Sequence, residues 1–421
     1  MIPRPAIAPS SPWAAPIPRV SSLDNGMSVW AYDLPGQYIL SCYLVLDLPL
    51  NAEAIDGVGT VAIRCLDEGT HSHPGESFAE TLGAVGGQFH GLVGNSTTQI
   101  LLDVPQSRLA QALPLYAEAV REPLFEADAI ERVIGNRLAE IEQQEAHGSA
   151  VASRALRQTL LAPGLRMGRP SGGTIATVER LTRDNVAEHH LLYSPRGAVL
   201  IVAGDLSGSA DVHSLVEEAF GTWNPDVTPT VPEVPAPGTP RRATIRRPGA
   251  VQVDVRMGWY GVGHLDERWA PLQVALAIMG GSFMSRLNSV LREERGYTYG
   301  ISMYPRPFRT GGTIEVSTST RTDAAAALVD EGLEILAARK PFTEEETAAA
   351  IGYLVGSTPL SLDTAEAVAS QGATIAAARL PLNYVDTILA DLAAVTPEAA
   401  TAAYRSLVIP EKATVITVGD L

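Results

Sequence analysis

The sequence predicts an α+β protein that is made of two similar domains. Short strand-like runs are mixed with longer helical runs, without the strict alternation of a parallel α/β protein. The end of the first half of the chain also returns at the end of the second half. The chain has 421 residues, which is longer than one hydrophobic core usually supports. Its 46% hydrophobic and 19% charged residues are typical of a globular protein.

The first half begins with strands and continues into helices. Residues 27–32 and 38–46 are rich in apolar, β-branched and aromatic side chains, and residues 98–104 alternate apolar with polar ones. These patterns predict strands. Residues 107–122 and 126–144 are rich in Ala, Glu, Arg and Leu, which predicts two long helices. Each half then closes on a strand that ends in Gly-Asp-Leu.

Two pairs of segments show the repeat. Residues 195–206 and 410–421 both begin with Pro and end in Gly-Asp-Leu, at an offset of 215 (410 − 195). Residues 125–135 and 342–352 both run from Phe to Ile-Gly, at an offset of 217 (352 − 135). Two matches at nearly one spacing indicate a duplicated domain.

A proline-rich segment separates the two halves. Proline recurs too often in residues 224–240 for a helix or a central strand, so this segment is expected to be an extended linker. The expected parts are an N-terminal extension at 1–19, a first α+β domain at 20–223, the linker at 224–240 and a second α+β domain at 241–421.

Charge and cysteine content limit the partners and the compartment. The net charge of −16 repels phosphate backbones, so nucleic acid is not expected as a partner, whereas a cationic peptide or basic protein surface would be attracted. Solubility alone also accounts for this charge. The two cysteines, Cys42 and Cys65, form no CxxC pair and fit a reducing compartment. Because the chain shows neither a signal peptide nor an apolar run of roughly 18 residues, a cytoplasmic protein without a membrane partner is expected.

Five motifs lie in order along the chain. They are LDNGM at 23–27, GVGTVAIRCLDEGT at 57–70, GGQFH at 86–90, YSP with its following strand at 193–205, and SRL with LREERGYTYG at 285–300. Together they resemble the pitrilysin/insulinase family of zinc metallopeptidases, in its bacterial, mitochondrial-processing-peptidase-like branch. The resemblance covers essentially the whole chain. It implies two duplicated α+β domains that form half of a clam shell, with two such halves enclosing a peptide chamber.

The zinc motif of that family is missing from this sequence. Members that cut peptides carry HxxEH on their first helix, where two His side chains one turn apart bind zinc and the Glu activates a water molecule. The resemblance places Thr60, Ile63 and Arg64 at these three positions, and Glu140 at the position of the later glutamate ligand. No metal or other cofactor is therefore expected in this chain. An ion pair between Arg64 and Glu140 is expected in place of the metal.

The second half keeps a pair that the family uses on its substrate. Arg292 and Tyr299 match an arginine and a tyrosine that bind the substrate backbone near the scissile bond, and in two-chain members the chain without zinc supplies them. A guanidinium and a phenol can donate hydrogen bonds to a peptide carbonyl and to the developing oxyanion. Gly296 is expected to end the preceding helix. The alternative is an ordinary exposed helix end.

A glycine-rich stretch at 86–94 predicts an edge strand. In the family this strand binds an extended peptide, so Phe89, His90 and Gly91 are expected to contact substrate, unless the strand beside the lost zinc site is only scaffold.

The remaining histidines have no metal-site spacing. The sequence Asn-Val-Ala-Glu-His at 185–189 is a near-match to HxxEH, but His189 and His190 are expected on a helix surface. His71 and His73 are expected in a solvated loop.

The resemblance implies a non-catalytic, substrate-binding subunit of a heterodimeric zinc metallopeptidase. Its partner would be a homologous chain that carries HxxEH and the zinc, and its substrate would be a peptide. The alternative is a catalytically inert scaffold or peptide-binding protein of the same fold. The sequence identifies neither the peptide nor the partner, and it leaves homodimer formation open.

Overall fold

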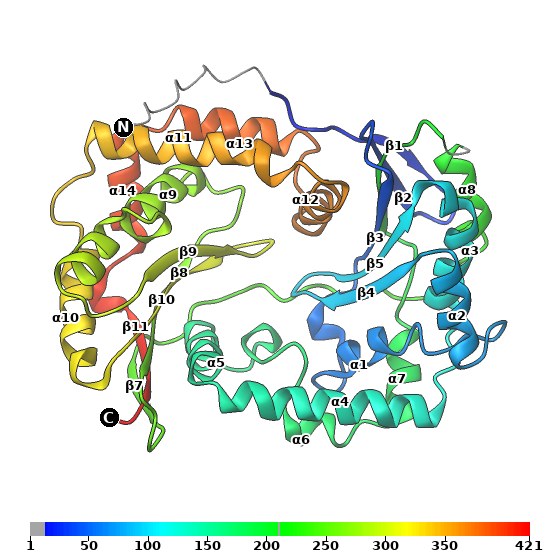
Figure 1. Cartoon of the computed structure of the whole chain (residues 1–421), viewed down its shortest axis with the longest axis horizontal. Coiled ribbons are helices and arrows are strands. Elements are labelled where there is room, and N and C mark those ends of the chain that lie inside the picture. The colour runs from blue at the N-terminus through cyan, green and yellow to red at the C-terminus, as the bar shows by residue number, and fades with distance from the viewer. Residues whose placement is uncertain (1–12, 209–210) are drawn as a thin grey trace, which may run out of the picture.

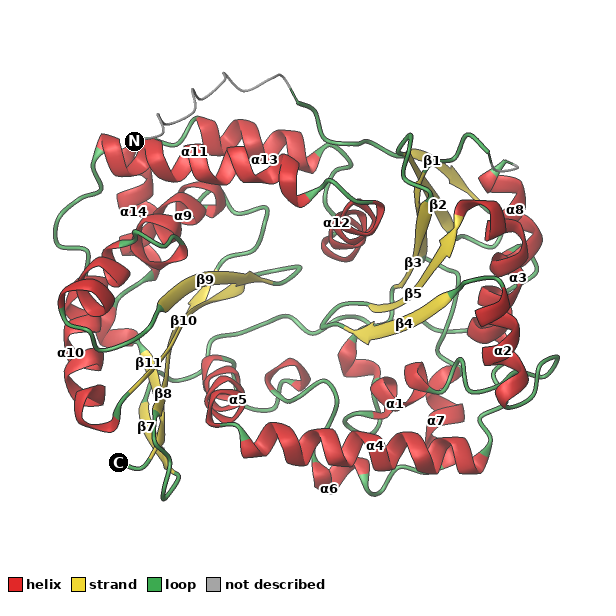
Figure 2. Cartoon of the chain, viewed as in Figure 1, coloured by secondary structure: helices red, strands yellow, loops and turns green. Residues whose placement is uncertain are grey.

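The computed structural model describes residues 13–208 and 211–421, and its helices surround two β-sheets (Figures 1 and 2). The first sheet has the strand order β1-β2-β6-β3-β5-β4 and the second has the order β7-β11-β8-β10-β9. The mixed α+β class is confirmed. The strands of the first sheet are β1 Arg19–Ser22, β2 Ser28–Asp33, β3 Ile39–Leu46, β4 Gln88–Val93, β5 Thr98–Pro105 and β6 Val199–Gly204. Those of the second are β7 Arg242–Arg246, β8 Val253–Gly261, β9 Ile301–Pro307, β10 Gly312–Thr320 and β11 Thr414–Gly419.

Helices are interspersed with the strands in both halves. The first half contains α1 Val58–Arg64, α2 Glu76–Ala84, α3 Leu109–Arg121, α4 Ala127–Ala146, α5 Gly148–Leu160, α6 Ile175–Val178, α7 Arg183–His190 and α8 Val212–Phe220. The second contains α9 Trp269–Leu276, α10 Ala325–Leu336, α11 Glu344–Ser361, α12 Ala365–Ala378, α13 Tyr384–Ala393 and α14 Pro397–Leu407. Two wider, π-type helical segments are η4 Ala277–Gly281 and η5 Asn288–Glu294. Single 3₁₀ turns are η1 Leu50–Ala52, η2 Gln106–Arg108, η3 Arg166–Gly168, η6 Thr322–Ala324 and η7 Pro410–Lys412.

The two sheets share one topology, apart from the additional strand β1. In each, the strand that closes the half is parallel to an early strand: β6 pairs with β2, and β11 pairs with β7. The remaining pairs are antiparallel. This agreement fits the duplication that the sequence predicts. The predicted strand at 38–46 and the predicted helix at 126–144 are also present, as β3 and α4.

Each half of the chain contributes a helix to the sheet of the other half. Helix α5 packs on β8 and β11, where Ala152 and Leu156 are buried against Ile416 and Val418. Helix α12 packs on β3 and β6, where Ala369 is buried against Ile201. Figure 1 shows α12 beside the first sheet and α5 beside the second. Small residues permit this close packing, because a Cβ on Gly372 would lie 3.2 Å from the ring of Tyr32. The two sheets are therefore joined through shared apolar cores.

The proline-rich segment 224–240 contains no helix or named strand, as predicted for a linker. It is nevertheless fastened to the first half, because Gly238 N–H donates to the Leu160 carbonyl at 2.8 Å and Leu161 forms a bridge with Pro237. Within residues 13–208 and 211–421, none of the helices has both the length and the apolar character that crossing a bilayer requires.

Candidate functional site

Helix α1 carries the three positions at which the resemblance places the lost zinc motif. Most of this helix is buried, including Ile63, whereas Thr60 and Arg64 emerge on one face a single turn apart. Gly57 precedes the helix at φ +97°, where a Cβ would approach the backbone of Gly173 to 3.0 Å. Only glycine fits this turn, which sets the direction in which α1 leaves the preceding loop.

A buried carboxylate fixes the segment beside the start of α1. Glu53 accepts hydrogen bonds from the N–H groups of Gly57 at 3.2 Å and Gly59 at 3.0 Å. It also pairs with Arg166 at 2.5 Å, and both side chains are almost fully buried. Burial raises the pKa of Glu53, although Arg166 opposes the shift. Because Arg166 also donates to the Ser171 carbonyl at 3.1 Å, residues 166–173 are held against α1.

The predicted ion pair between Arg64 and Glu140 is present. Nη1 of Arg64 lies 2.8 Å from Oε1 of Glu140, and Nη1 of Arg137 lies 2.9 Å from Oε2 of the same carboxylate. Arg137 also donates from Nε to the Gly172 carbonyl at 2.9 Å. The hydrogen bond from Arg64 is the largest cause of the lowered pKa of Glu140, and burial opposes it. One carboxylate is thus shared by two guanidiniums.

Arg137 is the contact that the sequence analysis missed. It lies three residues before Glu140 on α4, which places the two side chains on one helix face. This three-residue spacing is visible in the sequence and is typical of an ion pair on one helix face.

The residues at this site do not fit zinc. Thr60 offers no imidazole, Ile63 cannot exchange a proton, and Arg64 keeps its own positive charge where a cation would lie. Within the described part of the chain, no three His, Cys, Asp or Glu side chains gather as metal ligands.

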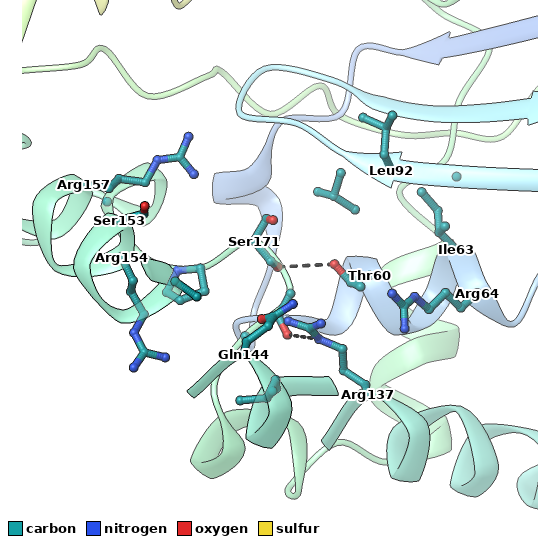
Figure 3. A pocket seen from close by; sticks show the side chains of 18 of the residues that line it. Thr60, Ile63, Arg64, Leu92, Arg137, Gln144, Ser153, Arg154, Arg157 and Ser171 are labelled. Carbon is teal, nitrogen blue, oxygen red and sulfur yellow. Dashed lines mark hydrogen bonds between the residues drawn. The ribbon is translucent and has the colours of Figure 1, made fainter. Parts of the chain in front are cut away.

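A cavity of about 490 Å³ adjoins the ion pair. Thr60, Ile63 and Arg64 form part of its wall, as Figure 3 shows. Helix α5 lines another side with Arg154 and Arg157. The second sheet completes the wall with Arg306 of β9 and Glu315 of β10, together with residues of β4, α4 and segment 168–173. Both halves of the chain therefore form this cavity.

Strand β4 lies at the edge of the first sheet, as the glycine-rich stretch predicted. Phe89 points into the core, where its ring meets Tyr116 edge-to-face with centroids 5.9 Å apart. His90 and Gly91 are exposed, and a Cβ on Gly91 would collide with Ile63 of α1. Leu92 is exposed and lines the cavity. The edge strand thus runs directly past the position of the lost motif.

Arg292 and Tyr299 lie in the second half of the chain and are not among the residues that line the cavity beside Arg64. Arg292 belongs to η5, where its Cζ lies 3.5 Å from the centroid of the Phe283 ring and its guanidinium pairs with Glu293 at 2.8 Å. Tyr299 is 97% exposed. Gly296, at φ +62°, ends the helical segment as predicted. No hydrogen bond joins Arg292 to Tyr299 in the described residues.

The predicted surface position is wrong for His189 and holds only in part for His190, whereas His71 and His73 lie in a loop as predicted. His189 is 5% exposed because α7 packs against α1, and this burial lowers its pKa to about 4. His190 is half-buried, with Nε2 2.8 Å from the Val120 carbonyl. His71 is exposed, whereas His73 is half-buried and lies 3.1 Å from the Glu118 carboxylate.

Comparison with known proteins identifies the family. Residues 51–170 match the model of insulinase (peptidase family M16), and residues 180–354 match the model of the peptidase M16 inactive domain. An uncharacterized zinc protease of Streptomyces coelicolor is 25% identical over 370 residues, which cover 84% of this chain and 79% of that protein. An uncharacterized zinc protease of Mycobacterium tuberculosis is 27% identical over 369 residues, covering 85% and 83%.

Solved structures show the same fold. The peptidase M16 inactive domain from Pseudomonas fluorescens superposes with a TM-score of 0.88 at 22% identity, covering 96% of this chain and 98% of that one. A protease from Helicobacter pylori superposes with a TM-score of 0.85 at 14% identity, covering 96% and 100%. Because two models of one family match most of its length, the chain belongs to the insulinase family of peptidases, family M16, as a member without the HxxEH zinc motif.

Proposed function

We propose that this chain is the non-catalytic, substrate-binding subunit of a two-chain zinc metallopeptidase in the cytoplasm. The observation that carries the proposal is the Arg64–Glu140 ion pair, which lies beside a cavity of about 490 Å³ in a peptidase fold. Where the resemblance implies a metal, this chain has a salt bridge, and a cavity adjoins that salt bridge. A homologous chain with HxxEH would supply the zinc and its activated water.

The substrate of this subunit is an extended peptide. Strand β4 has one free edge in the described sheet, and its residues 91–93 line the cavity. An extended peptide can add to such an edge through main-chain hydrogen bonds. Zinc protease relatives that match over most of their length support a peptide as the substrate.

Arg292 and Tyr299 are the groups that this chain would lend to the partner's active site. The ring of Phe283 and the carboxylate of Glu293 hold the Arg292 guanidinium in one orientation, and Tyr299 reaches into solvent beyond Gly296. A guanidinium that is already oriented before the substrate arrives can bind a peptide carbonyl and stabilise the oxyanion that forms from it. The partner's bound water would attack that carbonyl.

The test measures peptide cleavage and zinc content in this chain alone, in an HxxEH homologue alone and in their mixture. We expect cleavage to require both chains, and Arg292→Ala to lower turnover by about a hundredfold without loss of the complex. Arg295→Ala is the matched control, because Arg295 is an exposed arginine three residues away that pairs with Glu331. Unchanged turnover with Arg292→Ala would reject the shared site. A stable complex that cuts no peptide would support an inert scaffold instead.

A further inference from the structure

We propose that the cavity beside the Arg64–Glu140 ion pair is a carboxylate-binding site, which selects peptides that carry a negative charge where they pass α5. The inference rests on the proposed peptide-binding function and adds the class of peptide. The carboxylate can come from the C-terminus of the peptide or from an Asp or Glu side chain. The site is built from helix α5, helix α4 and strand β9, which approach each other from both halves of the chain.

The side chains around this cavity carry a net positive charge, whereas the whole protein is negatively charged. One acidic side chain lines the wall, Glu315, and two further carboxylates, Glu140 and Glu145, pair with arginines of the wall. Five arginines line it: Arg64, Arg137, Arg154, Arg157 and Arg306. Five guanidiniums against three carboxylates leave an excess of two positive charges, in a chain whose net charge is −16. A concave wall of one sign raises the local concentration of anions.

Arg157 is the one guanidinium of this wall that no carboxylate neutralises by direct pairing in the described residues. Arg64 and Arg137 share Glu140, Arg154 pairs with Glu145 and Arg306 pairs with Glu315. Burial lowers the pKa of Arg157, and the charges of Arg306 and Arg166 lower it further, against the effect of Glu315. Figure 3 shows its guanidinium extending from α5 into the cavity, toward Leu92 of β4. An incoming anion would relieve this uncompensated charge.

The shape of a guanidinium favours carboxylates over other negatively charged groups that a peptide can carry. Its N–H donors form a planar fork that binds the two oxygens of a carboxylate in parallel. The fork of Arg157 faces the strand whose residues 91–93 line the same cavity. A peptide paired with the free edge of β4 would therefore run past Arg157 and place an acidic group within its reach.

The test uses the purified full-length chain and short N-acetylated peptides with a neutral fluorophore, compared by fluorescence anisotropy at low and high salt. One pair differs only in a C-terminal acid or amide, and a second amidated pair differs only in an internal Asp or Asn. We expect an acidic member to bind about tenfold more tightly than its neutral counterpart. The preference should shrink at high salt, because salt screens the attraction between the acidic peptide and the cavity.

Three variants assign this preference to the cavity. Arg157→Gln should abolish it, and Arg157→Lys should restore part of it. Arg180→Gln removes the same charge from an exposed position outside the cavity and should leave the preference intact. Which of the two pairs shows the preference identifies a terminal or a side-chain carboxylate.

Two results would overturn the inference. Equal affinity for acidic and neutral peptides would reject the carboxylate site while leaving the peptide-binding function intact, as would a preference that survives Arg157→Gln. Conversely, a preference for acidic peptides in a chain whose Arg292→Ala variant still supports full turnover would reject the shared active site and keep the carboxylate site.

Discussion

The guanidinium of Arg64 lies 2.8 Å from the carboxylate of Glu140, although 76 residues separate them in the chain. The first is on α1 and the second on α4, so the ion pair joins these two helices at the positions where the family resemblance implies metal ligands. It therefore preserves the contact between the helices without the chemistry of a bound water. Five predictions test this site and the structure around it.

Restoring the motif should restore metal binding. The triple variant Thr60→His, Ile63→Glu, Arg64→His places two imidazoles on one face of α1, and Glu140 already lies against position 64. We expect one zinc ion per chain by metal analysis, compared with none in the parent. Adding Glu140→Ala should weaken zinc binding. A triple variant that retains no more zinc than the parent would reject the assignment of these positions.

Removing the shared carboxylate should destabilise the fold. In Glu140→Gln, Arg137 stays largely buried, with 8% of its side chain exposed, and loses its charged partner. We expect the free energy of unfolding in urea to fall by about 1 kcal/mol, a modest value because Glu140 itself is 40% exposed. Glu68→Gln breaks the pair with Arg132, whose side chain is 55% exposed, and should have a smaller effect. Equal losses in both variants would mean that the burial of Arg137 contributes nothing.

The stabilisation that the Glu140 carboxylate provides should depend on pH. The pKa of Glu140 is lowered in the folded chain, so its stabilisation is complete above the ordinary value of 4.5 and is lost as the pH falls through the folded value. Parent and Glu140→Gln should therefore differ in urea midpoint at neutral pH and converge in acid. A difference that stays constant into acid would contradict the ion pair as its cause.

His189 should make the protein sensitive to mild acid. Burial lowers its pKa from 6.5 to about 4, so the folded state resists a proton that the unfolded state accepts. Between pH 7 and about pH 5 this should cost about 2 kcal/mol of unfolding free energy, a loss that grows as the pH falls toward 4. His189→Leu should flatten this part of the stability profile. An identical pH profile in parent and variant would show that His189 is accessible to protons.

The helix α12 should couple the two sheets. Ala369 is fully buried against the first sheet, so Ala369→Leu overpacks that contact and should lower the free energy of unfolding by about 2 kcal/mol. Thr374→Leu adds a similar side chain on the exposed face of α12 and serves as the control. A single unfolding transition, shifted as a whole, is expected by calorimetry. Separate transitions for the two sheets would contradict the coupling.

Local pattern and motif spacing predicted the elements and the ion pair. The fixed spacing within the motif placed Thr60 and Arg64 one turn apart, and the distance along the chain identified Glu140 as their neighbour. The glycines of 86–94 indicated β4 as an edge strand, which the sheet order confirms. These features could be predicted because the local conformation of a helix or strand determines where its side chains point.

Features that arise only from packing between distant elements were not predicted. His189 is buried because α7 meets α1, and a polar helix gives no local sign of such a neighbour. Arg157 faces β4 because α5 packs on the second sheet, where Leu156 meets Val418. Neither contact has a periodicity that the sequence could reveal, since the partners lie far apart in the chain.

The exchange of α5 and α12 determines how this polypeptide can be divided. A cut within residues 224–240 would leave each fragment with an apolar sheet surface whose covering helix belongs to the other fragment. Produced alone, each fragment would expose that surface and aggregate. Produced together, the two would complement each other and reassemble as a non-covalent pair, because the interlocked helices, rather than the peptide bond of the linker, hold the halves in register.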